Sequence, residues 1–142
     1  MQAYRKRAKR GFSLVELLAV VLVLAVLAAV AVPLYISQRK SAAGRACKAN
    51  IAAIANAASA YALRNGAYPA TGAAVWSSKL VGANEGLAKW PACPLGADYT
   101  CTTNADGSAE IACPNDGAHA GFGGAAGDWT VDLAKPGADS LP

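Results

Sequence analysis

The stretch "GFSLVELLAVVLVLAVLAAVAVP", Gly11 to Pro33, decides the fold of this chain. It is almost continuously apolar and long enough to cross a lipid bilayer as a helix, which takes about 20 apolar residues. Its alanines let helices approach one another closely, in lipid or in a bundle. One carboxylate, Glu16, lies inside the apolar run, where burying a charge is costly. The stretch therefore predicts an apolar helix in which Glu16 needs a specific reason to be present.

Basic residues are concentrated before this helix. The segment from Met1 to Arg10 contains five of the chain's 13 Lys and Arg residues. Without these five, 8 Lys and Arg remain against 9 Asp and Glu, so the formal charge of +4 belongs to the N-terminal segment. The basic pI therefore gives no support for a nucleic-acid partner. Residues 1–11 read as a short basic leader and not as folded structure.

Three kinds of protein begin in this way. The first is a secreted protein with a signal peptide, for which Ala29-Val30-Ala31 would be the cleavage site. The second is a plain single-pass anchor, and the third is a precursor that is cut at a glycine and keeps its apolar helix. Glu16 argues against the first two, because a signal peptide has no use for a carboxylate and a plain anchor loses about 1–3 kcal/mol through it.

Cleavage after Gly11 would give Glu16 a partner. The new α-amine of Phe12 would be a cation about one helical turn from Glu16, in equally apolar surroundings. In a stack of such helices, each Glu16 could pair with the Phe12 amine of a neighbouring chain. Two charges that are costly to bury alone then become acceptable together. Such pairs would favour one axial register of the helices, which a helical filament needs.

The helical pattern continues beyond Pro33. The segment from Ser37 to Arg64 is rich in alanine and favours a helix, and Asn65-Gly66 is a typical helix end. We expect one helix of about fifty residues, with an apolar half at 12–36 and an amphipathic half at 37–65. Pro33 removes one backbone hydrogen bond and should kink it; a separate helix after Pro33 is the alternative. Apolar residues of the second half recur every three or four positions: Cys47, Ile51, Ile54, Ala58 and Tyr61.

Residues 66–142 predict a small β-rich head. Ala67 to Pro91 reads as a loop with a short helical turn around Lys79 and Leu80. Asp98 to Cys113 predicts a hairpin that turns at Asp106-Gly107 and sets Cys101 opposite Ile111. The expected fold class is α+β, with the long N-terminal helix packed through its apolar stripe on a small antiparallel sheet of about three strands.

Two further segments complete the predicted head. His119 to Gly127 is glycine-rich and predicts a flexible surface loop, and Asp128 to Leu133 predicts the third strand. Five aromatic residues should lie in the core or at contacts between subunits: Tyr68, Trp76, Trp90, Tyr99 and Trp129.

The residues Gly11-Phe12-Ser13-Leu14-Val15-Glu16, after a basic leader and before an apolar run to Pro33, closely resemble the type IV pilin and pseudopilin family. "GAYP", Gly66 to Pro69, is also similar to that family. The resemblance implies that a prepilin peptidase cuts between Gly11 and Phe12 and methylates the Phe12 amine. It further implies that Glu16 governs assembly and that Pro33 marks a region which loosens in the filament.

The same resemblance implies a function and partners. The chain would be a structural subunit, not an enzyme, of a type IV pilus-like filament that serves adhesion or twitching motility. It would start in the inner membrane, meet an assembly platform there, and polymerise with copies of itself into an extracellular filament. The alternatives are a pseudopilin of a type II secretion system and a minor pilin for DNA uptake or adhesion.

The four cysteines suggest disulfides and an oxidising compartment, and they allow three connectivities. The pattern "CPLGADYT…IACPNDG" resembles cysteine-bearing pilins, which implies a bridge between Cys93 and Cys113, with Cys47 and Cys101 as the second pair. Cys93, Cys101, Cys113 and His119 contain no closely spaced pair of metal ligands, so we expect no metal. No cofactor or catalytic residue is expected either. Three acidic residues are too scattered to suggest a calcium site: Asp128, Asp132 and Asp139.

Overall fold

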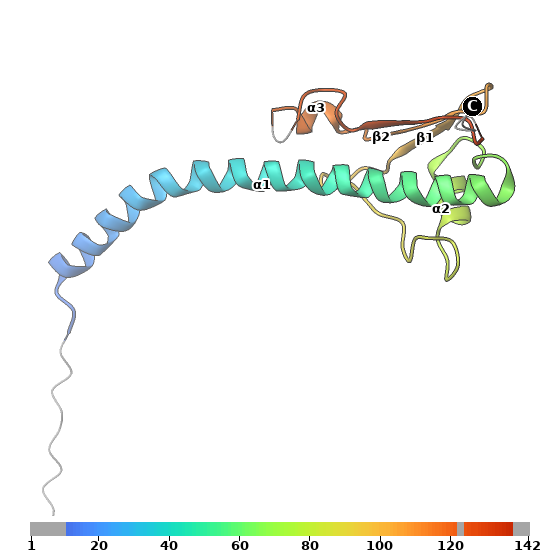
Figure 1. Ribbon diagram of the computed structural model, residues 1–142. Helices are drawn as coiled ribbons and strands as arrows, with labels where there is room; N and C mark the ends of the chain where they lie inside the picture. Colours follow the sequence, from blue (N-terminus) through green and yellow to red (C-terminus); the bar gives the residue numbers. More distant parts are fainter. Residues whose placement is uncertain (1–10, 122–123, 138–142) are drawn as a thin grey trace, which may run out of the picture. The chain divides into compact units, whose positions relative to one another are not determined.

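The computed structural model describes residues 11–121 and 124–137. Its elements follow in the order α1 (Leu14–Asn65), α2 (Ala73–Leu80), β1 (Thr100–Thr103), β2 (Ala109–Ala112), α3 (Asp116–His119) and β3 (Thr130–Leu133) (Figure 1). The chain divides into two compact units, Met1–Ile36 and Ser37–Pro142. The predicted leader lies outside the described residues except for Gly11, and so does Asp139.

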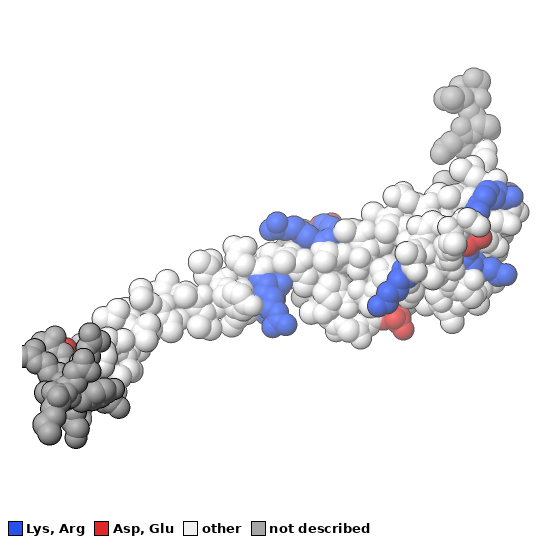
Figure 2. Space-filling view, turned by 90° about the horizontal axis from the view of Figure 1, so that it is seen from below, with Lys and Arg blue, Asp and Glu red and all other residues white. Residues whose placement is uncertain are grey.

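The first unit contains the beginning of α1, a helix of 52 residues in all. All residues from 11 to 36 are exposed, although the large ones among them are almost all apolar. Figure 2 accordingly shows a long stretch of this helix without blue or red side chains. In the described part of the chain, α1 is the one helix long and apolar enough to cross a membrane. Pro33 lies inside the helix, and the kink expected there stays a prediction.

The second half of α1 forms one wall of the hydrophobic core. Cys47, Ile51, Ile54 and Ala58 are each at most 1% exposed, so the apolar stripe predicted from their spacing is confirmed. Tyr61 packs against the same core but is half-buried. The helix ends at Asn65, and the amide of the next residue, a glycine with φ of 80°, donates to the carbonyl of Ala62 at 2.7 Å.

A three-stranded antiparallel sheet in the order β1-β2-β3 packs on this stripe. Figure 1 shows the strands lying along the second half of α1. Cys101 is paired with Ile111, and Ile111 with Val131, which is the register expected for the hairpin. The predicted α+β fold, a long helix packed on a small antiparallel sheet, is confirmed. Along β1, β2 and their ends, buried and exposed side chains alternate. The buried ones face the core: Tyr99, Cys101, Ala109 and Ile111.

The segment expected to be a loop with one helical turn contains an eight-residue helix, α2. Its sequence AAVWSSKL places Trp76 and Leu80 four positions apart, so both side chains point to one face. That face is completely buried in the core. The amide of Gly72, just before α2, donates to the carbonyl of Cys101 at 2.9 Å and so fixes the helix beside β1. The full length of α2 was not predictable from the sequence, because so short a helix is stabilised only by tertiary packing.

The prediction of a flexible loop beginning at His119 is wrong at that residue. His119 ends the short helix α3 and is 1% exposed. Its ring lies 5.2 Å from the ring of Trp129, which is itself completely buried. Packing against Trp129 therefore places this histidine in the core, whereas the glycines that follow it in the sequence had indicated a surface loop.

Candidate functional site

The beginning of α1 gives Glu16 a local partner. The backbone amide of Ser13 donates a hydrogen bond of 2.9 Å to Oε2 of Glu16. Ser13 is the residue before the helix and Glu16 is its third residue, so the contact is one half of a capping box. A carboxylate there also interacts favourably with the helix dipole. The signal for this cap is the Ser-x-x-Glu pattern of Ser13-Leu14-Val15-Glu16 in the sequence.

The predicted cleavage point lies just outside this cap. Gly11 and Phe12 precede the first helical residue and belong to no helix or strand. The side chain of Phe12 is 85% exposed, and among the described residues none beyond its chain neighbours comes within 4 Å of the Cβ position of Gly11. A peptidase binds its substrate as accessible chain, and the bond between these residues meets that requirement. Cleavage there and methylation of Phe12 stay predictions.

The four cysteines are all buried and all thiols. The Sγ atoms of Cys93 and Cys113 lie 3.6 Å apart, so the structure brings the first predicted pair together without a bond. Cys47 lies beside that pair, whereas Cys101 is not a member of the group. Both disulfide pairings stay predictions.

His119 completes this group. Its Nε2 atom lies 3.3 Å from Sγ of Cys93. The ligand atoms of Cys47, Cys93, Cys113 and His119 all lie within 4.8 Å of one another. We call these four residues the thiol–imidazole cluster. Their sequence spacing, with gaps of 46, 20 and 6 positions, gave no sign of it.

Burial and hydrogen bonding act differently on the cysteines. Burial raises the pKa of the Cys101 thiol to about 12 and also raises the pKa of Cys47. Burial likewise raises the pKa of Cys113, and the neighbouring Cys47 adds to that rise. For Cys93 burial is again the largest influence, but hydrogen bonds from Leu95, Asn115 and His119 together outweigh it and lower the pKa. Cys93 is therefore the cysteine most readily converted to a thiolate.

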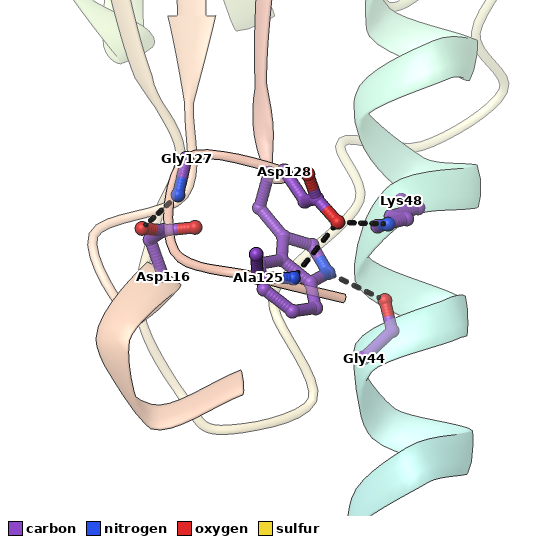
Figure 3. A network of polar contacts seen from close by, with 7 residues as sticks. Gly44, Lys48, Asp116, Ala125, Gly127 and Asp128 are labelled. Carbon is purple, nitrogen blue, oxygen red and sulfur yellow. Dashed lines mark hydrogen bonds and ion pairs between the residues drawn. The ribbon is translucent and has the colours of Figure 1, made fainter. Parts of the chain in front are cut away.

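A polar network fixes the segment around Trp129 to α1 (Figure 3). The indole of Trp129 donates to the carbonyl of Gly44 at 2.8 Å. Next to it, Oδ2 of Asp128 accepts from the amide of Ala125 at 2.9 Å and forms an ion pair with Nζ of Lys48 at 3.2 Å. The same ammonium group lies 4.9 Å from the centre of the Trp129 ring. Asp128 thus links the segment before β3 to the second half of α1.

Comparisons with known proteins found similarity in the N-terminal part of the chain. A family model described as the prokaryotic N-terminal methylation motif matches residues 6–32. The Type II secretion system core protein G of Pseudomonas aeruginosa is 42% identical over 67 residues, which is 47% of either chain. The match thus spans about half the length of that relative. No solved structure matches the chain. The resemblance to type IV pilins and pseudopilins is thereby confirmed.

Proposed function

We propose that this chain is the structural subunit of a type IV pilus-like filament and that it polymerises through its N-terminal helix. The observation that carries the proposal is the exposed apolar surface of α1 from Leu14 to Ile36, most of which lies within the methylation motif matched at residues 6–32. A helix that is apolar all round and bare of partners must be covered by lipid or by other helices. In the membrane-held precursor, lipid would cover this helix. In the filament, the same helices of neighbouring chains would cover it.

Leader removal would change what surrounds Glu16. The amide of Ser13, to which Glu16 is bonded, lies one residue from the future N-terminal amine of Phe12. In a filament, the Glu16 carboxylate would meet the Phe12 amine of a neighbouring chain and set the axial register of the helices. Capping requires only a hydrogen-bond acceptor, whereas pairing with an amine requires the negative charge. The two roles of Glu16 can therefore be separated by experiment.

Glu16→Gln is the decisive variant, because glutamine keeps the acceptor and removes the charge. We expect Glu16→Gln and Glu16→Ala precursors to be membrane-bound and processed, and both to yield far fewer filaments than the wild type. Ser13→Ala is the matched control, since it leaves both the backbone amide and the carboxylate in place. Normal filament yield from Glu16→Gln would show that capping, and not charge, is the function of this residue.

The mature N-terminus tests the processing route on which the proposal depends. The intact mass and N-terminal sequence should be measured on protein from membranes and from sheared cell surfaces. We expect a chain that begins at Phe12 and is heavier by one methyl group. A chain beginning at Val32 would indicate an ordinary signal peptide, and one beginning at Met1 a plain anchor. Either result would overturn the filament proposal.

The second candidate function is that of a pseudopilin in a type II secretion system, which the similarity to core protein G favours. Electron microscopy of sheared cell surfaces separates the two. Long surface filaments that carry this chain support a pilin. Their absence, together with loss of protein secretion when the gene is deleted, supports a pseudopilin. In either case a prepilin peptidase and an inner-membrane assembly platform would be the partners.

A minor pilin that binds DNA or a host surface is the third alternative. On the face that Figure 2 shows, the basic side chains lie singly along the chain and form no continuous strip. Strong nucleic-acid binding relies on several basic groups that contact successive phosphates. The visible face therefore gives no support to nucleic-acid binding by a minor pilin. The role that we propose is that of a structural subunit and not of an enzyme.

A further inference from the structure

We propose that the thiol–imidazole cluster, Cys47, Cys93, Cys113 and His119, is a structural site for one zinc ion. Three cysteines and one histidine are a common ligand set of structural zinc, which is held tetrahedrally by four protein ligands. Thiolate sulfur favours zinc over magnesium, calcium or manganese, which prefer oxygen. This site lies between the second half of α1 and the head, and it is independent of the assembly role proposed for the apolar first half of that helix.

The distances suit such a tetrahedron. In a tetrahedron, Zn–S bonds of about 2.3 Å and a Zn–N bond of about 2.0 Å place ligand atoms about 3.5–3.8 Å apart. The Sγ atoms of Cys93 and Cys113 are 3.6 Å apart, and Nε2 of His119 is 3.3 Å from Sγ of Cys93. The remaining separations are at most 4.8 Å, so small side-chain movements would bring all four ligand atoms to bonding distance of one ion.

Two turns of the same construction present Cys93 and Cys113. Each cysteine is followed by a proline, which favours the second position of a turn. Both turns are closed by the amide three residues on: Gly96 donates to the carbonyl of Cys93 at 2.8 Å, and Asp116 to that of Cys113 at 3.1 Å. A disulfide does not require this repeated construction. Two turns of the same geometry can direct both sulfur atoms toward one ion.

The turns also direct N–H groups at the sulfur of Cys93. The amide of Leu95 donates to Sγ of Cys93 at 3.5 Å, and the side-chain amide of Asn115 donates to the same sulfur at 3.5 Å. Such N–H···S bonds stabilise thiolates, the form of cysteine that binds metal. They act as the outer hydrogen bonds that orient ligands in metal sites.

The other two ligands are held from outside the cluster as well. Cys47 lies on α1 in the same buried core as Tyr99, whose hydroxyl accepts from the side-chain amide of Asn50 at 3.1 Å. His119 lies against the ring of Trp129, which is anchored to α1. The four ligands are at most 3% exposed, so no position is left for water and the ion would be structural and not catalytic.

Zinc would connect segments that are far apart in the sequence. The ion would join α1, the loop before β1, the end of β2 and α3. Such a staple suits a small head that is rich in glycine and alanine.

The predicted disulfide between Cys93 and Cys113 competes for the same atoms, so one measurement decides between them. The full-length protein should be purified from membranes in detergent, without reductant or chelator, and its zinc content measured by mass spectrometry of the element. We expect about one zinc per chain. Replacement of zinc by Co²⁺ should give the absorption of thiolate-to-cobalt charge transfer and of tetrahedral cobalt.

Cys101→Ser is the matched control, because Cys101 is an equally buried cysteine of the same core outside the cluster. It should keep about one zinc, whereas Cys47→Ser and His119→Gln should each lose at least tenfold in affinity. Zinc below a tenth of the protein, or a Cys93–Cys113 disulfide in a non-reduced digest, would overturn the proposal. The wild-type zinc content and cobalt spectrum decide the question even when a variant fails to fold.

Discussion

The indole nitrogen of Trp129 donates a hydrogen bond of 2.8 Å to the carbonyl oxygen of Gly44, which lies 85 positions earlier in the chain. This bond joins the segment that leads into β3 to the middle of α1. Trp129 is completely buried, and both partners in the bond are shielded from water. The contact therefore fixes where the end of the sheet lies on the helix, close to the thiol–imidazole cluster.

Replacing Trp129 by phenylalanine should destabilise the head by about 1–3 kcal/mol. The substitution removes the hydrogen bond to Gly44 and part of a buried aromatic surface. Thermal unfolding of the full-length protein in detergent, followed by near-ultraviolet circular dichroism, measures the change. A loss well below 1 kcal/mol would mean that the bond contributes little.

Trp76→Phe is the matched control for that measurement. Trp76 is as deeply buried as Trp129, but its indole nitrogen has no hydrogen-bond partner among the described residues. Phenylalanine removes this unsatisfied donor, which offsets part of the lost packing. We expect Trp76→Phe to cost less than Trp129→Phe, and the reverse order would contradict the role assigned to the Gly44 bond.

Asp128→Asn should lower the melting temperature slightly at neutral pH and not at all in acid. The amide of Ala125 and then the ammonium group of Lys48 hold the pKa of Asp128 below its ordinary value. A carboxyl with a lowered pKa stabilises the folded state above its unfolded pKa of about 3.9 and loses this effect as the pH falls through its folded pKa.

Melting temperatures of wild type and Asp128→Asn between about pH 7 and pH 3 check this prediction. The difference should be small, since both partners of the ion pair are more than a third exposed. It should shrink in about 1 M salt, which screens exposed charges. A difference that persists unchanged at low pH would show that the charge of Asp128 is not its cause.

Gly107→Ala should destabilise the β1–β2 hairpin by about 1 kcal/mol. Gly107 has a φ of 88°, and a Cβ there would lie 3.3 Å from the side chain of Lys135. Gly117→Ala is the control, since Gly117 belongs to α3 and no described residue outside its own helix segment lies within 4 Å of its Cβ position. Alanine favours helices, so this second change should be neutral or stabilising. Equal losses in denaturant titrations would contradict the argument.

Ile54→Ala should cost about 2–5 kcal/mol, because it leaves a cavity in the core between α1 and the sheet. Ile54 is completely buried, whereas Leu63 on the same helix is 79% exposed. Leu63→Ala should therefore change the free energy of unfolding by less than about 0.5 kcal/mol. Denaturant titration of both variants measures this, and a large loss for Leu63→Ala would place that residue at a contact between chains.

Much of the fold was predictable because its signals are local. Apolar residues at intervals of three and four can only line one face of a helix, so the spacing of Cys47, Ile51 and Ile54 was enough to place the core on α1. The Asp106-Gly107 turn and the alternation on either side of it likewise fixed the register of the hairpin. The methylation motif was readable for the same reason, since it is one uninterrupted stretch.

The tertiary structure alone decided which residues from separate segments meet. Nothing local distinguishes Cys101 from Cys47 as a neighbour of Cys93, and the choice depends on which face of α1 meets the end of the sheet. His119 followed the same rule: the glycines after it suggested a loop, but packing against Trp129 buried it. Sequence determines periodicity and turns, whereas a site built from four separate segments exists only once the chain has packed.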